Sequence, residues 1–190
     1  VAFTIAVSSD VEVGNRHIYG AAKKFPDRIL PLTMLHAGFP QDWKAILRNG
    51  ERNSTRGIKL ISAYQRTDEM KIDWSPALDY ASGKSWIVLN HSWGSPERLA
   101  MWAEKFPSVT FLIGHPPRGY EDVVRKYPNV YMTTCASFVL FFCPSVAELW
   151  RSLPVEKILL GSDCQDLDFC TAIGELAYSH EIPETDKRRI

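Results

Sequence analysis

Three residues of this chain combine a reactive chemical type with an informative position. His91, His115 and Asp163 each stand at the end of an apolar run, and these runs begin at residues 86, 109 and 157. A neutral imidazole is a good zinc ligand, and a carboxylate beside a metal-activated water can take its proton. Chance would rarely place three such residues at equivalent positions. They therefore indicate a hydrolytic metal site that uses zinc, manganese or iron(II).

Each of the three residues also has a structural interpretation. His91 could cap the helix that follows it, and His115, between Gly114 and two prolines, could make a hydrogen bond within its loop. Asp163 could be a helix N-cap, but the next helix is expected several residues later. A carboxylate after an apolar strand is costly to bury unless it is paired or binds a metal, which favours a functional role for Asp163. A rigid loop that presents His115 suits a general acid or an oxyanion donor.

Five other residues are weaker candidates. Tyr64, Trp93 and Arg118 lie on loops after expected strands and could line a substrate pocket, although surface placement is the more usual outcome. In such a pocket Arg118 could hold a substrate carboxylate. Lys59 could bridge or bind a substrate from inside the sheet, or form a buried ion pair. His36 ends another expected strand at the same level as His91.

The elements that position these residues alternate along the chain. Apolar runs predict strands at residues 1–7, 28–35, 57–61, 86–90, 109–113, 130–134 and 157–160. Helical patterns and caps predict helices at residues 13–25, 41–49, 95–105, 120–127, 145–153 and 169–178, with two more that begin near residues 75 and 185. Strands without a polar face, separated by helices, indicate a parallel sheet that is covered on both sides.

Seven strand–helix units favour an α/β fold of the (β/α)8 TIM-type barrel class, lacking the first strand and the final helix. The units have the size of a βα repeat, and no glycine-rich phosphate-binding motif follows any strand. Residues 1–190 are expected to form a single barrel domain that is incomplete at both ends. An open barrel leaves an exposed sheet edge, which a second copy could cover, so a homodimer is an expectation.

Composition narrows the partners and the compartment. The 22 basic and 22 acidic side chains balance, and no apolar run approaches the length of a membrane span. We therefore expect a small-molecule substrate, with no nucleic acid and no membrane as partners. The four cysteines form no Cys-x-x-Cys pair, which indicates reduced thiols and a cytoplasmic protein. Cys164 is next to Asp163, but nothing nearby marks it as a nucleophile.

Several short segments resemble the amidohydrolase-2 branch of the amidohydrolase superfamily, in the same order along the chain. They are residues 21–31, 56–60, 91–94, 103–115, 127–131 and 156–163, and the resemblance covers nearly the whole chain. This family includes enzymes similar to aminocarboxymuconate-semialdehyde decarboxylase. The resemblance implies a distorted (β/α)8 barrel that hydrolyses C–N or C–O bonds, or decarboxylates aromatic or muconate-type acids. It also implies one divalent metal ion, with zinc expected and manganese or iron as alternatives.

The resemblance assigns roles to the three strand-end residues. His91 corresponds to the strand-5 histidine that binds the metal, and His115 to the strand-6 histidine that orients water or substrate. Asp163 corresponds to the strand-8 aspartate that binds the metal and acts as a base. The family's first strand carries a His-x-His pair, which this chain does not contain. The missing pair is explained if this sequence begins at strand 2 of a longer parent protein.

Three functions remain open from the sequence. The leading hypothesis is a metal-dependent hydrolase acting on a small molecule, with a decarboxylase of the same family as its main variant. A degenerate, non-catalytic barrel that serves as a scaffold or binding protein is the second. A lactonase that uses Asp163 and the histidines without a metal is the third.

Overall fold

The computed structural model describes residues 1–5, 10–39, 41–137, 140, 142–164 and 168–190. Each strand pairs in parallel with the next one along the chain, so that six strands form one sheet in sequence order. The strands are β1 (Thr33–Met34), β2 (Gly57–Leu60), β3 (Ile87–Asn90), β4 (Thr110–Ile113), β5 (Val130–Thr133) and β6 (Ile158–Leu159). The predicted parallel α/β class is confirmed.

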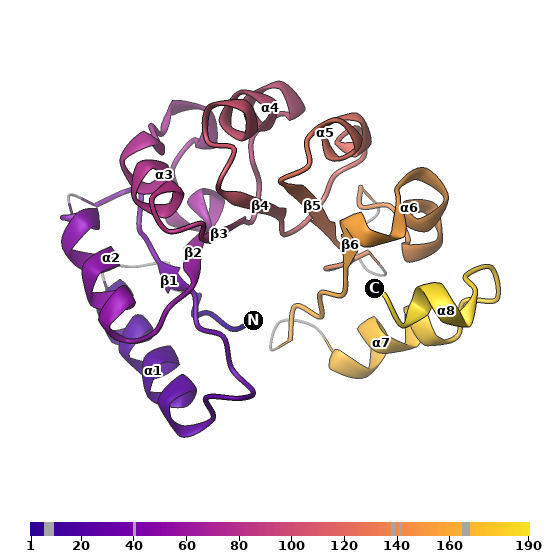
Figure 1. Ribbon diagram of the computed structural model, residues 1–190, viewed down its shortest axis with the longest axis horizontal. Coiled ribbons are helices and arrows are strands. Elements are labelled where there is room, and N and C mark those ends of the chain that lie inside the picture. The colour runs from indigo at the N-terminus through magenta and orange to yellow at the C-terminus, as the bar shows by residue number, and fades with distance from the viewer. Residues whose placement is uncertain (6–9, 40, 138–139, 141, 165–167) are drawn as a thin grey trace.

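Helices connect these strands and lie outside them. The α-helices are α1 (Val11–Lys24), α2 (Trp43–Arg52), α3 (Ser75–Ser82), α4 (Pro96–Lys105), α5 (Glu121–Lys126), α6 (Val146–Ser152), α7 (Phe169–Ala177) and α8 (Glu184–Lys187). Short 3-10 turns are η1 (Ser62–Gln65), η2 (Glu69–Lys71) and η3 (Val155–Lys157). The strands follow an incomplete ring, and α1 and α7 lie on the two sides of its opening (Figure 1). No helix of the described part of the chain is long and apolar enough to cross a membrane.

The first expected strand is described only at its beginning. Ala2 forms an isolated parallel bridge with Pro31, made by hydrogen bonds to the backbone of Leu30 and Leu32. Residues 6–9, where the strand was expected to end, lie outside the described residues. The bridge places the N-terminal segment beside the chain that leads into β1, as expected for a strand that precedes it.

Both faces of the sheet are apolar, which explains the unbroken hydrophobic runs. One face packs against the helices through a large cluster that includes Ile58, Phe111 and Met132. The other face lines the inside of the ring, where Leu89 and Leu112 pack together. Side chains alternate between the two faces along each strand, so a strand that is buried on both faces is apolar at most of its positions.

Polar caps start the helices at the expected places. The Ser95 side chain accepts a hydrogen bond from the backbone N–H of Arg98 at the start of α4, and Asp42 does the same for Ala45 in α2. Ser145 opens α6 with a capping box. These caps satisfy N–H groups that have no partner inside the helix, and so determine where each helix begins.

The close approach of β2 and β3 predicts the effect of adding one methyl group. A Cβ at Gly57 would lie 2.2 Å from the carbonyl oxygen of Ile87, its register partner. We expect Gly57→Ala to lower the free energy of unfolding by about 1–3 kcal/mol or more, because the strands must separate. Urea unfolding followed by circular dichroism measures this change.

Gly20→Ala is the matched control for this substitution. Gly20 lies within α1, and a Cβ there would meet nothing within 4 Å. Alanine should therefore raise the free energy of unfolding by about 0.5–1 kcal/mol through its better helix propensity. Equal effects of the two substitutions would contradict the described packing of β2 against β3.

Candidate metal-binding active site

Four reactive side chains follow the carboxyl ends of four consecutive strands. His91 comes directly after β3, His115 follows β4, Cys135 follows β5 and Asp163 follows β6. The ladder continues past the strands, because the N–H of His115 donates to the carbonyl of His91 at 3.3 Å. Since parallel strands end at the same edge of a sheet, these loops bring their side chains to one place.

Three donor atoms converge at this edge. Nε2 of His115 lies 3.5 Å from Oδ2 of Asp163 and 3.6 Å from Sγ of Cys135. All three donor atoms lie within 4.8 Å of one another. Cys135 is buried, and the other two residues are partly buried. The structure therefore brings together His115 and Asp163, as the sequence predicts, and adds a thiol to them.

His91 and Tyr64 lie beside this group rather than within it. The His91 ring packs against the His115 ring with 4.2 Å between their centroids, and the Tyr64 ring centroid lies 4.8 Å from that of His91. Tyr64 is 44% exposed, so it can meet a substrate that approaches from solvent. The structure thus brings Tyr64 next to His91.

Glycines allow the strand ends to come this close. A Cβ at Gly161 would lie 3.0 Å from the Cβ of Cys135, and one at Gly114 would lie 2.9 Å from the carbonyl oxygen of Asn90. Asp163 itself has a φ of 50°, in the left-handed region that non-glycine residues rarely adopt. The Gly-His and Gly-Ser-Asp motifs thus place a glycine where the backbones touch, and the reactive residue just beyond it.

Burial and neighbouring charges set the protonation of the group. Burial, together with the charges of His115 and Lys59, lowers the pKa of His91 to about 3, so this imidazole is neutral at neutral pH. The hydrogen bond with His115 lowers the pKa of Asp163, which is therefore ionised. Burial and the negative charge of Asp163 raise the pKa of the Cys135 thiol to about 12.

A lysine lies inside the ring near these groups. Lys59 is in β2, is 3% exposed, and points to the inner face, where its Nζ lies 4.5 Å from the centre of the Phe3 ring. Burial lowers its pKa to about 8, and the charges of Cys135 and Asp163 act in the opposite direction. Its ammonium group is therefore mostly charged at neutral pH and contributes positive potential to the site.

The donors are chemically suited to a divalent metal ion. An imidazole nitrogen and an ionised carboxylate oxygen already lie at the separation of ligands that share an ion, and a second, neutral imidazole is adjacent. Zinc, manganese and iron(II) all accept this combination of nitrogen and oxygen. The residues present therefore fit the metal that the sequence predicts.

Two of the predicted substrate-binding residues are not brought to this group. Trp93 is fully buried, its Nε1 donates to the carbonyl of Leu112 at 3.0 Å, and its ring meets the edge of Phe111. It belongs to the core between the sheet and the helices, where a substrate has no access. The prediction that Trp93 binds substrate is therefore corrected, because its side chain is fully buried in this core.

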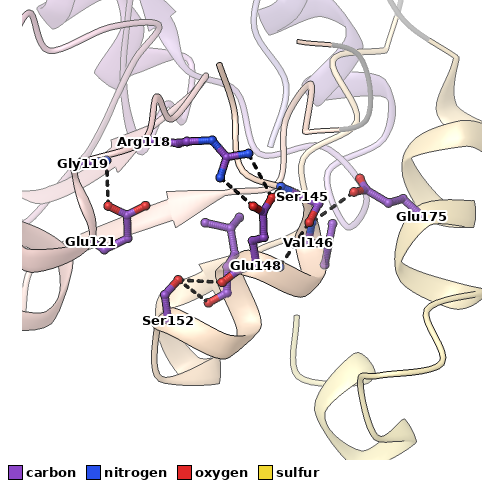
Figure 2. A network of polar contacts seen from close by, with 9 residues as sticks. Arg118, Gly119, Glu121, Ser145, Val146, Glu148, Ser152 and Glu175 are labelled. Carbon is purple, nitrogen blue, oxygen red and sulfur yellow. Dashed lines mark hydrogen bonds and ion pairs between the residues drawn. The ribbon is translucent and has the colours of Figure 1, made fainter. Parts of the chain in front are cut away.

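Arg118 has a structural partner instead of a free guanidinium group. Its two terminal nitrogens donate to the carboxylate of Glu148 at 2.7 and 3.1 Å (Figure 2). Glu148 also completes the capping box of α6 with Ser145, and Glu175 of α7 accepts from the N–H of Val146. Arg118 thus binds a carboxylate of the chain itself, and not the substrate carboxylate that was predicted. This ion pair connects the loop after β4 to α6.

Cys135 is the residue that the sequence analysis missed. It follows the expected strand at residues 130–134 just as His91 and His115 follow theirs. The same signal would have found it. Cys164, which the sequence does not mark as a nucleophile, is exposed.

Comparisons with known proteins agree with this architecture. An uncharacterized TIM-barrel protein from Bordetella bronchiseptica superposes with a TM-score of 0.77 at 14% identity, over 93% of this chain and 68% of that one. The 4-oxalomesaconate hydratase from Rhodopseudomonas palustris has a TM-score of 0.65 at 15% identity, over 97% and 69% of the two chains. A Polaromonas dihydroxybenzoic acid decarboxylase with bound manganese and 2-nitroresorcinol has a TM-score of 0.67 at 15% identity, over 95% and 71%.

At these identities the structural likeness shows the TIM-barrel fold alone. No curated protein matches the sequence significantly. A family model described as amidohydrolase, however, matches residues 44–190, a span that contains His91, His115, Cys135 and Asp163. By this match over most of its length, the chain belongs to the amidohydrolase-2 family.

Proposed function

We propose that this chain carries the catalytic residues of a metal-dependent hydrolase that cleaves a C–N or C–O bond of a small molecule. The observation that carries the proposal is the ionised Asp163 carboxylate, 3.5 Å from the imidazole of His115 at the carboxyl ends of the strands. A carboxylate in contact with an imidazole is a pair that can take and return a proton. Family membership and enzymes among the structural neighbours support an enzyme over a scaffold.

The geometry favours His115 and Asp163 as the residues that would hold the ion. Nε2 of His115 and Oδ2 of Asp163 face each other, whereas His91 packs with its ring against His115. This exchanges the roles that the family resemblance assigns to the two histidines. His91 then remains a neutral imidazole, which can donate a hydrogen bond to the oxyanion that develops on a substrate.

The bound ion would supply Lewis acidity, which acidifies water and polarises a substrate carbonyl. Asp163 accepts the proton of the attacking water, because its depressed pKa keeps it ionised. His91 stabilises the negative charge that forms on the substrate oxygen. Tyr64, exposed beside His91, offers a ring against which a flat substrate can pack.

Decarboxylation is the second candidate, and Lys59 favours it. A buried ammonium group is costly unless an anion accompanies it, and this one lies inside the ring close to the reactive group. The charge of Asp163 already acts on Lys59, and a substrate carboxylate would provide a second anion for it. Small aromatic or muconate-type acids provide one, and the Polaromonas neighbour is by its description a decarboxylase of such an acid.

Removing the charge of Asp163 tests the hydrolase proposal. On the natural full-length protein loaded with zinc or manganese, Asp163→Asn should lower kcat about 10²–10⁴-fold, because the amide cannot accept the proton. A panel of amides, lactones and aromatic acids, followed by product and CO2 release, separates hydrolysis from decarboxylation. Asp79→Asn, an exposed position on α3, is the control and should be neutral. The proposal would be refuted if Asp163→Asn kept full activity and the unaltered protein bound no metal.

Metal content distinguishes the roles of the two histidines. His115→Ala should lose most of the bound metal, since it removes a ligand. His91→Ala should keep the metal while kcat falls about tenfold to a thousandfold, as expected for loss of an oxyanion donor. Elemental analysis of the dialysed proteins gives the metal content, and His17→Ala, exposed on α1, is the control. The opposite pattern would restore the assignment in which His91 is the ligand.

Lys59→Met tests the carboxylate-binding role. We expect KM for carboxylate substrates to rise at least tenfold, with KM for neutral substrates unchanged. The unfolding free energy should stay the same or increase, because a buried charge is removed. In the unaltered protein, kcat/KM for carboxylate substrates should fall as the pH rises through about 8, where Lys59 loses its proton. Lys71→Met, at an exposed position, is the control. Equal KM values of the two variants for carboxylate substrates would refute the carboxylate-binding role of Lys59.

A further inference from the structure

The sulfur of Cys135 lies where a metal ligand would lie. Its distance to Nε2 of His115 is 3.6 Å, and the distance from that nitrogen to Oδ2 of Asp163 is 3.5 Å. In a tetrahedral zinc site, bonds of about 2.3 Å to sulfur and about 2.0–2.2 Å to nitrogen and oxygen separate neighbouring ligands by roughly 3.4–3.6 Å. Two edges of the observed triangle thus already have the size that one shared ion requires.

We propose that Cys135 is a thiolate ligand, together with His115 and Asp163, of the divalent ion, and that its sulfur makes this site select zinc over manganese. The proposal rests on the proposed function, which requires a metal at this edge of the sheet. Thiolate is a soft donor that zinc accepts and that manganese and magnesium disfavour. On binding, the S–H bond breaks, the sulfur keeps the electron pair, and the proton leaves to solvent.

Charge balance supports a thiolate at this position. One thiolate and one carboxylate neutralise a divalent cation, so the complete group carries no net charge. Neutrality matters here because Cys135 is buried and His115 and Asp163 are partly buried. The positive charge of Lys59 acts on Cys135 against the burial that raises the pKa of its thiol, so the ion itself must displace the proton.

The backbone holds Cys135 in place for this role. Its N–H is directed to Oγ1 of Thr133 at 3.4 Å, and Gly161 leaves room for its side chain where any larger residue would press on it. Ala136, the next residue, has a φ of 60°, which turns the chain sharply after the cysteine. The positioning thus comes from the segments that directly follow β5 and β6, two neighbouring strands of the sheet.

The other cysteines offer no equivalent donor in the described part of the chain. Cys164 and Cys170 are exposed, and the group of clustered donor atoms contains neither of them nor the buried Cys143. The chain's five histidines include no His-x-His pair. Among the described cysteines, Cys135 is therefore the one placed to bind an ion together with the imidazole of His115 and the carboxylate of Asp163.

The three ligands that the described residues supply would by themselves leave coordination positions open. Catalytic zinc sites usually combine three protein ligands with a water or substrate in the fourth position. The exposed Tyr64 and the neutral His91 lie on the His115 side of the group, where a substrate would approach. The sulfur-containing set is therefore compatible with catalysis and does not describe a closed structural site.

Cobalt substitution tests the sulfur ligand without relying on activity. Cobalt(II) bound to the natural full-length protein should show a near-ultraviolet sulfur-to-cobalt charge-transfer band. Cys135→Ser should lose this band while the visible ligand-field bands of bound cobalt persist. Cys164→Ser, adjacent to Asp163 in sequence but exposed, should keep the band. In competition, wild-type protein should prefer zinc to manganese, and Cys135→Ser should reduce that preference at least tenfold.

X-ray absorption at the zinc edge of the unaltered protein gives a readout that no folding defect of a variant can affect. Sulfur scattering at about 2.3 Å supports the proposal. A bound ion with only nitrogen and oxygen neighbours overturns it and leaves the proposed function standing; Cys135 is then a hydrogen-bonding neighbour of His115. Absence of any bound ion, in protein that is folded by circular dichroism, overturns both.

Discussion

The register between neighbouring parallel strands is the constraint on which the rest of this structure depends. Ile113 pairs with Asn90 across β3 and β4, and Met132 pairs with Ile113 across β4 and β5. Because the pairs are aligned, the residues that follow each strand emerge at nearly the same height. A shift by a single residue would turn each side chain to the opposite face and separate the donors. The alignment of the strands is therefore also the alignment of the site.

Burial of both faces of the sheet stabilises this register. Helices α2 to α6 cover one face, while Leu89 and Leu112 pack together on the inner face. Burial of apolar surface on both sides contributes about 25 cal/mol for each Å² removed from water, which is the dominant favourable term. The inner face nevertheless accepts the charged side chain of Lys59. A cation placed there at such cost is the kind of local exception that accompanies a functional site.

The strand ends carry the donor atoms of the site, and contacts between loops and helices surround the sheet. The donors of His115, Cys135 and Asp163 sit on the strand ends, and glycines remove the atoms that would hold the strand ends apart. The ion pair of Arg118 with Glu148 and the cap at Ser145 connect the loop after β4 to the start of α6 (Figure 2). Surface ion pairs of this kind contribute little to stability, so their role is to position loops and not to hold the fold together.

The sequence by itself determined the alternation of strands and helices, the parallel sheet and the family. It also predicted that His115 and Asp163 belong together. Periodicity, caps and strand ends are local signals, and they specify the level at which a residue emerges from the sheet. Only the tertiary structure decided which side chains meet at that level. Trp93 turned into the core, Arg118 met Glu148 and Cys135 joined the donors, because each outcome depends on partners about 20 to 30 residues away in the chain.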